Sequence, residues 1–209
     1  MAQKMKDKFV VTITREFGSM GRPIAKKLAE KLGVAYYDRD IVDLAAKKLN
    51  MPVSQIGELE ESVQGRFFRM KYPLGMGTSD IQDEIFNEQQ KIIRELACKE
   101  SCVIVGRCSD YVLREFENSI HIYIYAPREV RYKTCINDFN LSPDEAKKMM
   151  LEVDSARERY HKQYAGYLPY DAHYKNLLVD SNALGVEGTV EFLAQFVEDY
   201  IKVHKKNEE

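Results

Sequence analysis

Short apolar runs alternate with amphipathic segments along most of the chain. Runs rich in β-branched and aromatic residues predict five strands, at 9–14, 34–38, 102–105, 120–125 and 177–179. Between them, apolar residues recur every three or four positions, which predicts helices over about 23–32, 39–49, 79–97, 109–116, 127–166 (two helices) and around 190–197, with a turn at 180–182. Strands that alternate with helices are typical of βαβ units, so we expect an α/β protein with a parallel sheet covered on both faces.

Composition narrows the choice of function. The chain has 209 residues, a length typical of one domain, and its 31 Lys and Arg against 33 Asp and Glu argue against a broadly basic nucleic-acid-binding protein. No apolar run is long enough to cross a membrane, and the charged start of the chain lacks the apolar core of a secretion signal. The sequence therefore predicts a cytoplasmic protein without nucleic-acid or membrane partners, and it leaves the oligomeric state open.

Cysteine and histidine spacing does not indicate a metal centre. The four cysteines form no C-x-x-C pair, and the four histidines are scattered without the spacing of metal ligands. We expect reduced thiols in the core of the protein.

Unusual polar residues follow the first three predicted strands. The segment 15–22 contains Gly18 and Gly21 between the first strand and the first helix, Asp38-Arg39-Asp40 follows the second strand, and Gly106-Arg107 follows the third. Ligands of parallel α/β folds gather at the carboxyl ends of the strands, and a glycine loop before a helix can present its amides to an anion. Arginines at both ends of this loop favour phosphate as the ligand.

Four segments together resemble the cytidylate kinase-like family, a branch of the P-loop nucleoside monophosphate kinases. They are Thr14–Ala25 (TREFGSMGRPIA), Ala35–Ile41 (AYYDRDI), Val103–Arg107 (VIVGR) and Leu178–Ser181 (LVDS). The resemblance covers most of the chain and implies a three-layer P-loop kinase fold with strand order 2-3-1-4-5. It further implies one domain over 1–209, with an acceptor-binding insertion at about 39–79, a helical, arginine-rich lid at about 128–166, and the use of ATP and Mg²⁺.

The resemblance also assigns roles to residues. The phosphate-binding candidates are Arg15, Gly18, Ser19, Met20, Gly21 and Arg22. The acceptor-binding candidates are Asp38, Arg39, Arg69 and Arg107, with Arg66 and Phe67 beside them. The catalytic candidates are Arg22, Asp38 and the lid arginines Arg131, Arg157 and Arg159, with Arg128 as a further lid candidate, and Asp38 is the metal candidate.

The loop departs from the usual phosphate-binding motif. The pattern G-x-x-x-x-G-K-[ST] is not met, because the loop has no lysine and Pro23 replaces the hydroxyl residue. Arg22 lies beside the place of that lysine and could supply its positive charge. Val105 stands where related cytidylate kinases have an Asp, so Asp38 or the nucleotide would hold most of the metal.

Three functions are open at this point. The first is transfer of the γ-phosphoryl group of ATP to a nucleoside monophosphate, with CMP or dCMP as the default acceptor. The second is phosphorylation of a small hydroxylated metabolite, because Tyr36-Tyr-Asp-Arg-Asp40 is similar to the F-x-D-x-D pattern of shikimate kinase-like enzymes. The third is nucleotide or phosphometabolite binding without catalysis, which the missing lysine and hydroxyl residue would explain.

Overall fold

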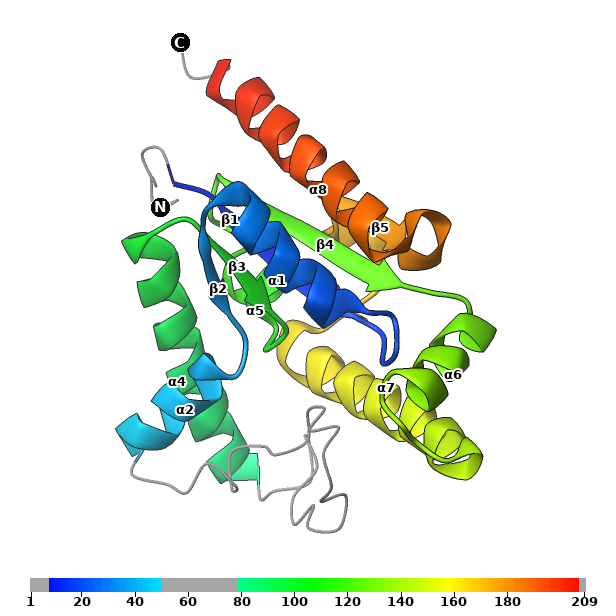
Figure 1. Ribbon diagram of the computed structural model, residues 1–209. Helices are drawn as coiled ribbons and strands as arrows, with labels where there is room; N and C mark the ends of the chain where they lie inside the picture. Colours follow the sequence, from blue (N-terminus) through cyan, green and yellow to red (C-terminus); the bar gives the residue numbers. More distant parts are fainter. Residues whose placement is uncertain (1–7, 50–78, 207–209) are drawn as a thin grey trace.

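The computed structural model describes residues 8–49 and 79–206 (Figure 1). The predictions for Arg66, Phe67 and Arg69, and for most of the acceptor-binding insertion, lie outside the described residues. The chain forms these elements in order: β1 Val10–Arg15, α1 Gly21–Leu32, β2 Ala35–Tyr37, α2 Asp40–Leu49, α4 Ser79–Lys99, β3 Cys102–Val105, α5 Ser109–Val112, β4 Ser119–Tyr125, α6 Arg128–Asn137, α7 Pro143–Ala165, a 3₁₀ turn Ala172–Tyr174, β5 Leu177–Asp180 and α8 Ser181–Lys206.

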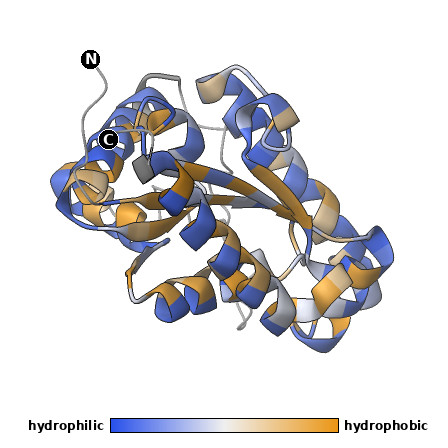
Figure 2. Ribbon diagram, turned by 90° about the horizontal axis from the view of Figure 1, so that it is seen from above, coloured by the Kyte–Doolittle hydropathy of each residue, from blue (hydrophilic) through white to orange (hydrophobic). Residues whose placement is uncertain are grey.

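The five strands form one parallel sheet in the order β2-β3-β1-β4-β5, which confirms the expected fold. The central strand β1 is buried along its whole length. Its side chains alternate between two cores, because successive residues of a strand point to opposite faces. Val11 and Ile13 pack towards α1 and α8, whereas Val10 packs towards α2, α4 and α5. Figure 2 shows the apolar strands between these two helical layers.

Two boundaries differ from the sequence prediction. The helix expected over 109–116 ends at Val112, and the chain then turns while Leu113 and Phe116 enter the core. The apolar spacing that predicted a longer helix therefore belongs to a buried turn. The turn expected at 180–182 is also wrong: α8 starts directly at Ser181, where Asp180 Oδ1 accepts a hydrogen bond from the Asn182 amide at 2.9 Å.

The helices α6 and α7 occupy residues 128–165, the segment for which the sequence predicted a lid, at the carboxyl end of the sheet. Ser142 and Glu145 cap α7 reciprocally, as their spacing predicted. A third apolar cluster joins these helices to the loop after β1, since Phe17 packs with Cys135, Met149 and Val153. All four cysteines are free thiols, as expected.

Candidate functional site

The loop between β1 and α1 is shaped to hold an anion. Gly18 and Met20 have φ of 77° and 58°, left-handed values that turn the chain sharply into the start of α1. The Ser19 hydroxyl donates to the Glu16 and Ile124 carbonyl oxygens at 2.9 and 3.3 Å, so this predicted phosphate ligand stabilises the loop with its side chain. The loop amides and the positive end of the α1 dipole are the groups with which this loop could hold an anion.

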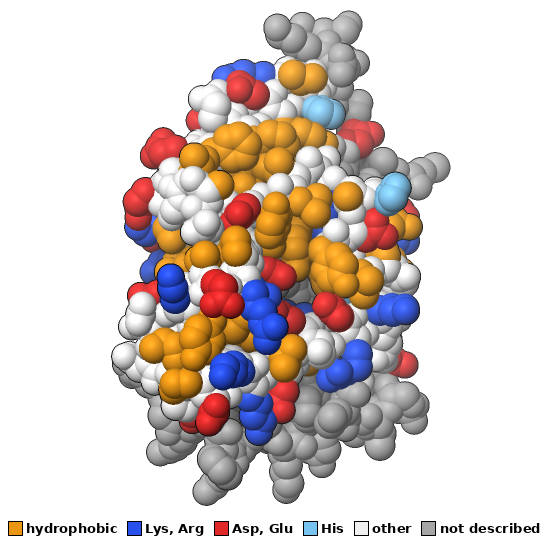
Figure 3. All heavy atoms as spheres, turned by 90° about the vertical axis from the view of Figure 1, so that its right-hand side faces the viewer, with side chains coloured by type: hydrophobic (Ala, Val, Ile, Leu, Met, Phe, Trp, Pro, Cys, Tyr) orange, Lys and Arg blue, Asp and Glu red, His pale blue; other side chains and the backbone are white. Residues whose placement is uncertain are grey.

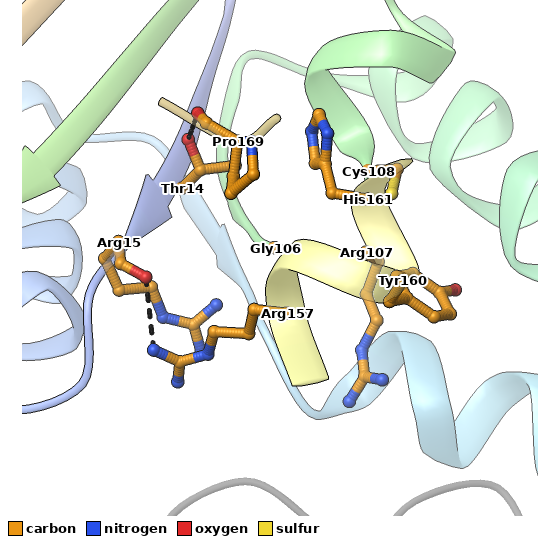
Figure 4. Close-up of a pocket in the computed structure, with 9 residues that line it drawn as sticks. All are labelled: Thr14, Arg15, Gly106, Arg107, Cys108, Arg157, Tyr160, His161 and Pro169. Atoms are coloured by element: carbon orange, nitrogen blue, oxygen red, sulfur yellow. Dashed lines mark hydrogen bonds between the residues drawn. The ribbon is translucent and has the colours of Figure 1, made fainter. Parts of the chain in front are cut away.

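Three buried arginines line one pocket beside this loop. Arg15 ends β1, Arg107 follows β3 and Arg157 lies on α7, and their exposed fractions are 6%, 5% and 9%. The cavity measures about 40 Å³, and none of the nine described residues that line it is acidic; the other six are Thr14, Gly106, Cys108, Tyr160, His161 and Pro169 (Figure 4). The Arg157 Nη1 group donates to the Arg15 carbonyl oxygen at 3.1 Å. Because guanidinium groups keep their charge at all relevant pH values, this pocket favours an anion with several oxygens.

A strained loop presents Arg107 to the pocket. Gly106, Arg107 and Cys108 have consecutive φ values of 73°, 58° and 51°. The left-handed conformation costs a residue with a side chain roughly 1–2 kcal/mol. Such strain is found at functional sites, where the surrounding structure maintains it, and here it places a predicted acceptor-binding arginine opposite Arg15 and Arg157.

Arg22 and Asp38 form an ion pair with each other. Arg22 Nε lies 2.5 Å from Asp38 Oδ2, and the Tyr36 hydroxyl donates to the same oxygen at 3.2 Å. Asp38 is 4% exposed, and its other oxygen, Oδ1, has no hydrogen-bond partner in the part of the chain that the structure describes. Burial, followed by the charge of Asp38, raises the pKa of Tyr36, which therefore stays protonated as a donor.

The predicted metal site lacks a set of ligands. A guanidinium group already neutralises Asp38, and within residues 8–49 and 79–206 no three acidic, histidine or cysteine residues cluster as metal ligands would. Magnesium is usually held by one or two carboxylates together with substrate phosphates. These residues do not build a magnesium site on their own.

Arg131, predicted as catalytic, connects the loop between β1 and α1 to α7. Its guanidinium lies 3.2 Å from Glu16 Oε2 and 2.6 Å from Asp154 Oδ2, and it donates to the Phe17 carbonyl oxygen at 3.2 Å. Asp154 also accepts a hydrogen bond from the Phe17 amide at 2.7 Å. Burial raises the pKa of Glu16 although Arg131 opposes the shift. These contacts hold the loop against α6 and α7.

A second cavity of about 270 Å³ lies between this junction and the sheet. Arg128 lines it together with Arg15, Arg131 and Arg157. Arg39 and Arg159 are exposed, and neither lines either of the two pockets. The structure thus gathers Arg15, Arg107 and Arg157 in one pocket, places Arg128 and Arg131 at the second, and leaves Arg22, Arg39 and Arg159 outside both.

The comparisons with known proteins agree with this geometry. The model of the cytidylate kinase-like family matches residues 10–183. The chain belongs to the cytidylate kinase-like family. As a member, it is a kinase-type phosphotransferase with a nucleotide substrate, and kinases of this kind usually work with a divalent metal.

Individual relatives of this cytidylate kinase-like chain are distant. A cytidylate kinase of Methanocaldococcus jannaschii is 22% identical over 92% of this chain and 99% of its own length. An uncharacterized protein from Eubacterium ventriosum has a similar structure, with a TM-score of 0.70 and 23% identity over 91% of this chain and 99% of its own. A shikimate kinase from Bacteroides thetaiotaomicron shares the fold, with a TM-score of 0.55 and 13% identity over 91% of this chain and 98% of its own. None of the described helices meets the length and hydropathy needed to span a bilayer.

A buried polar network behind the pocket was not predicted from the sequence. Asp110 on α5 is 1% exposed, and its carboxylate accepts hydrogen bonds from His161 at 3.0 Å, from the Tyr167 hydroxyl at 3.1 Å, and from Lys175. Burial alone would raise the pKa of Asp110, but its hydrogen bonds and the charges of His161 and Lys175 hold that pKa well below its ordinary value. One signal in the sequence could have indicated it, namely an aspartate directly before the apolar residues 111–113.

His161 joins this network to the arginine pocket. Its Nδ1 lies 2.9 Å from the Tyr167 carbonyl oxygen, and its Nε2 lies 3.0 Å from Asp110 Oδ2. Because His161 also lines the arginine pocket, the network supports one wall of that pocket.

Proposed function

We propose that this protein is an ATP-dependent phosphotransferase that moves the γ-phosphoryl group of ATP to a nucleoside monophosphate, with CMP or dCMP as the first acceptor to test. The observation that carries this proposal is the convergence of buried Arg15, Arg107 and Arg157 in a pocket that no acidic residue lines in the described part of the chain. A phosphate monoester carries nearly two negative charges at pH 7, so an acceptor of this kind suits that pocket. The weak match to a cytidylate kinase supports the choice of acceptor.

The proposed mechanism relies on positioning and charge. The loop amides and the start of α1 hold the nucleotide phosphates, while Arg107 and Arg157 hold the acceptor phosphate so that the two substrates meet in line. Chain 1–209 then acts as one P-loop kinase-like domain, with the acceptor-binding insertion at 39–79 and the lid at 128–166. Closure of the lid would bring Arg128 and Arg159 nearer to the phosphates and exclude water. Any magnesium would enter with the nucleotide, because the described residues do not build a site for it.

A coupled assay for ADP release tests this proposal. Purified protein is incubated with ATP and Mg²⁺ and, in turn, with CMP, dCMP, UMP, AMP and GMP, and the product is identified by mass spectrometry. Turnover with a pyrimidine monophosphate, together with its loss in Arg107→Met, supports the proposal. The matched control is Arg114→Met, which removes an exposed arginine that lies just after α5. Absence of turnover with every monophosphate would contradict it.

One observation favours a second candidate, phosphorylation of a small alcohol. Asp38 Oδ1 is buried without a hydrogen-bond partner among the described residues, and a substrate hydroxyl could donate to it. A gluconokinase from Sinorhizobium meliloti and the shikimate kinase above share the fold and are named for small hydroxylated acceptors. Turnover of a hydroxy acid but of no nucleotide, abolished by Asp38→Asn, would establish this alternative.

Calorimetry separates both enzymes from a binding protein without catalysis. Binding of ATP and of a monophosphate, measured by heat release, without ADP formation over hours would indicate the third function. The same titrations with Arg107→Met show whether the observed binding uses the arginine pocket.

A further inference from the structure

The phosphate loop can be compared with the usual motif residue by residue once its conformation is known. In G-x-x-x-x-G-K-[ST], the lysine directly follows the last loop glycine and stands at the start of the helix. Here the last left-handed loop residue is Met20, and α1 starts at Gly21. Gly21 therefore stands in the place of the lysine, and Arg22 stands in the place of the hydroxyl residue. This differs from the alignment that the sequence suggested, in which Arg22 replaced the lysine.

The space that a side chain at position 21 would enter is filled by Arg15. A Cβ atom built on Gly21 would lie 2.7 Å from Arg15 Cβ and 3.0 Å from Arg15 Cγ. Carbon atoms do not approach so closely without displacement. The stem of Arg15 thus starts where the stem of the missing lysine would start.

The head of Arg15 is seated against a second glycine. A Cβ atom on Gly106 would lie 2.7 Å from Arg15 Nη1, and Gly106 has a φ of 73°. Arg15 is 6% exposed, and its carbonyl oxygen accepts the hydrogen bond from Arg157. Figure 4 shows the heads of Arg15 and Arg157 close together on one side of the pocket and that of Arg107 on the other. The Arg15 side chain therefore occupies the space that side chains at Gly21 and Gly106 would need.

Arg22 is directed elsewhere. Its Nε group pairs with Asp38 at 2.5 Å, and it does not line the arginine pocket. An arginine in the place of the hydroxyl residue puts a fixed positive charge next to Asp38, where the usual motif places the metal.

We infer that Arg15, the last residue of β1, replaces the missing loop lysine and contacts the triphosphate of the nucleotide. This inference rests on the proposed function, in which a nucleoside triphosphate binds the loop. The planar guanidinium can contact two phosphate oxygens at once, whereas an ammonium group acts as a compact charge. The ligand class is the polyphosphate chain, so inorganic tripolyphosphate should bind as well.

Binding of tripolyphosphate and of ATP, measured by calorimetry in metal-free buffer, tests the inference. Arg15→Met should weaken both affinities by about tenfold or more, the loss expected for one charge-assisted contact. The control Lys26→Met removes an exposed positive charge from α1 and should leave both affinities unchanged. The double variant Arg15→Gly, Gly21→Lys restores a lysine at the helix start and vacates the space that it needs, so it should recover most of the affinity.

The results of these binding and activity measurements distinguish the inference from the proposed function. If Arg22→Met abolishes binding while Arg15→Met binds normally, or if the double variant binds no better than Arg15→Gly, the inference is overturned. If wild type binds tripolyphosphate through Arg15 but phosphorylates no monophosphate, the inference stands and the proposed function fails. If wild type binds neither compound, both fail. If Arg15→Met does not fold, NMR of the wild type decides between the two arginines. Tripolyphosphate is added, and the shifts of the Arg15 and Arg22 Nε resonances are compared. The inference expects the larger shift at Arg15, and a larger shift at Arg22 would overturn it.

Discussion

The sharpest test of the fold concerns the buried carboxylate behind the pocket. Asp110 accepts hydrogen bonds from Lys175, whose side chain has no exposed surface, and from His161, whose side chain is 4% exposed. Asp110→Asn removes the negative charge but keeps the shape. It leaves the buried Lys175 ammonium group facing a neutral amide.

The expected loss is about 3–5 kcal/mol of the free energy of unfolding, the range measured when one partner of a buried ion pair is removed. For a chain of this length, 1 kcal/mol corresponds to roughly 2–4 °C in Tm, so the melting temperature should fall by roughly 6–20 °C. The matched control is Asp171→Asn. Asp171 also pairs with a histidine, at 3.0 Å, but His173 is 92% exposed, and solvent screening should make the change nearly neutral.

Urea unfolding at pH 7, followed by circular dichroism, measures both variants. The slope against urea should stay constant so that midpoints can be compared. The double variant Asp110→Asn, Lys175→Met should recover part of the loss, because it also removes the buried positive charge of Lys175. If Asp110→Asn and Asp171→Asn are equally stable, the network does not hold α5, α7 and the segment before β5 together, and the argument is refuted.

Three further predictions follow from single contacts. Burial lowers the pKa of His121 to about 4. Between pH 6.5 and 4 the unfolded chain therefore binds a proton that the folded chain does not, and acidification over this range should reduce the free energy of unfolding by up to about 3 kcal/mol. The variant His121→Gln should lose this dependence in unfolding experiments at pH 7 and 4.5. Gly18 has a φ of 77°, and a Cβ atom added there would lie 2.9 Å from the Arg131 carbonyl oxygen, whereas Gly33 has a φ of 66° and nothing within 4 Å of an added Cβ. The Tm of Gly18→Ala should therefore fall well below that of Gly33→Ala. Equal Tm values would contradict the close packing at Gly18. Ser181→Ala removes hydrogen bonds of 2.7 and 3.1 Å to a carbonyl oxygen of the loop between β1 and α1 and to one of β4. The free energy of unfolding, measured by thermal unfolding, should fall by about 1–3 kcal/mol. The control is the exposed Ser142→Ala, which removes only a helix cap.

The sheet could be predicted from the sequence because its strands are short, buried and separated by amphipathic helices. The five strands lie within one or two residues of the predicted ranges. The order 2-3-1-4-5 came from the family resemblance, since the alternation of strands and helices does not determine which strands are neighbours. The length of α5 could not be predicted, because buried residues of a turn can repeat the spacing of a helix.

The candidate site could be predicted only in part. Arg15, Arg107 and Arg157 were expected near phosphate, and the structure brings them into one pocket. The pairing of Arg22 with Asp38 was not expected, because spacing along the chain does not tell which side of a helix start a long side chain will take. The Asp110 network was missed for a similar reason: His161 and Lys175 are 51 and 65 residues away in the chain, and only the fold brings them together.

The register of the sheet explains why two of the arginines meet. Ile13 of β1 pairs with Val105 of β3, and each strand reaches an arginine two residues later, Arg15 and Arg107. Because β1 and β3 run parallel, two residues at the same distance beyond a paired position lie at the same edge of the sheet. The backbone of Arg15 is therefore fixed by β1, and that of Arg107 by the turn that directly follows β3. A charge anchored in this way needs little rearrangement when an anion binds, which is the property that a phosphate-transfer site requires.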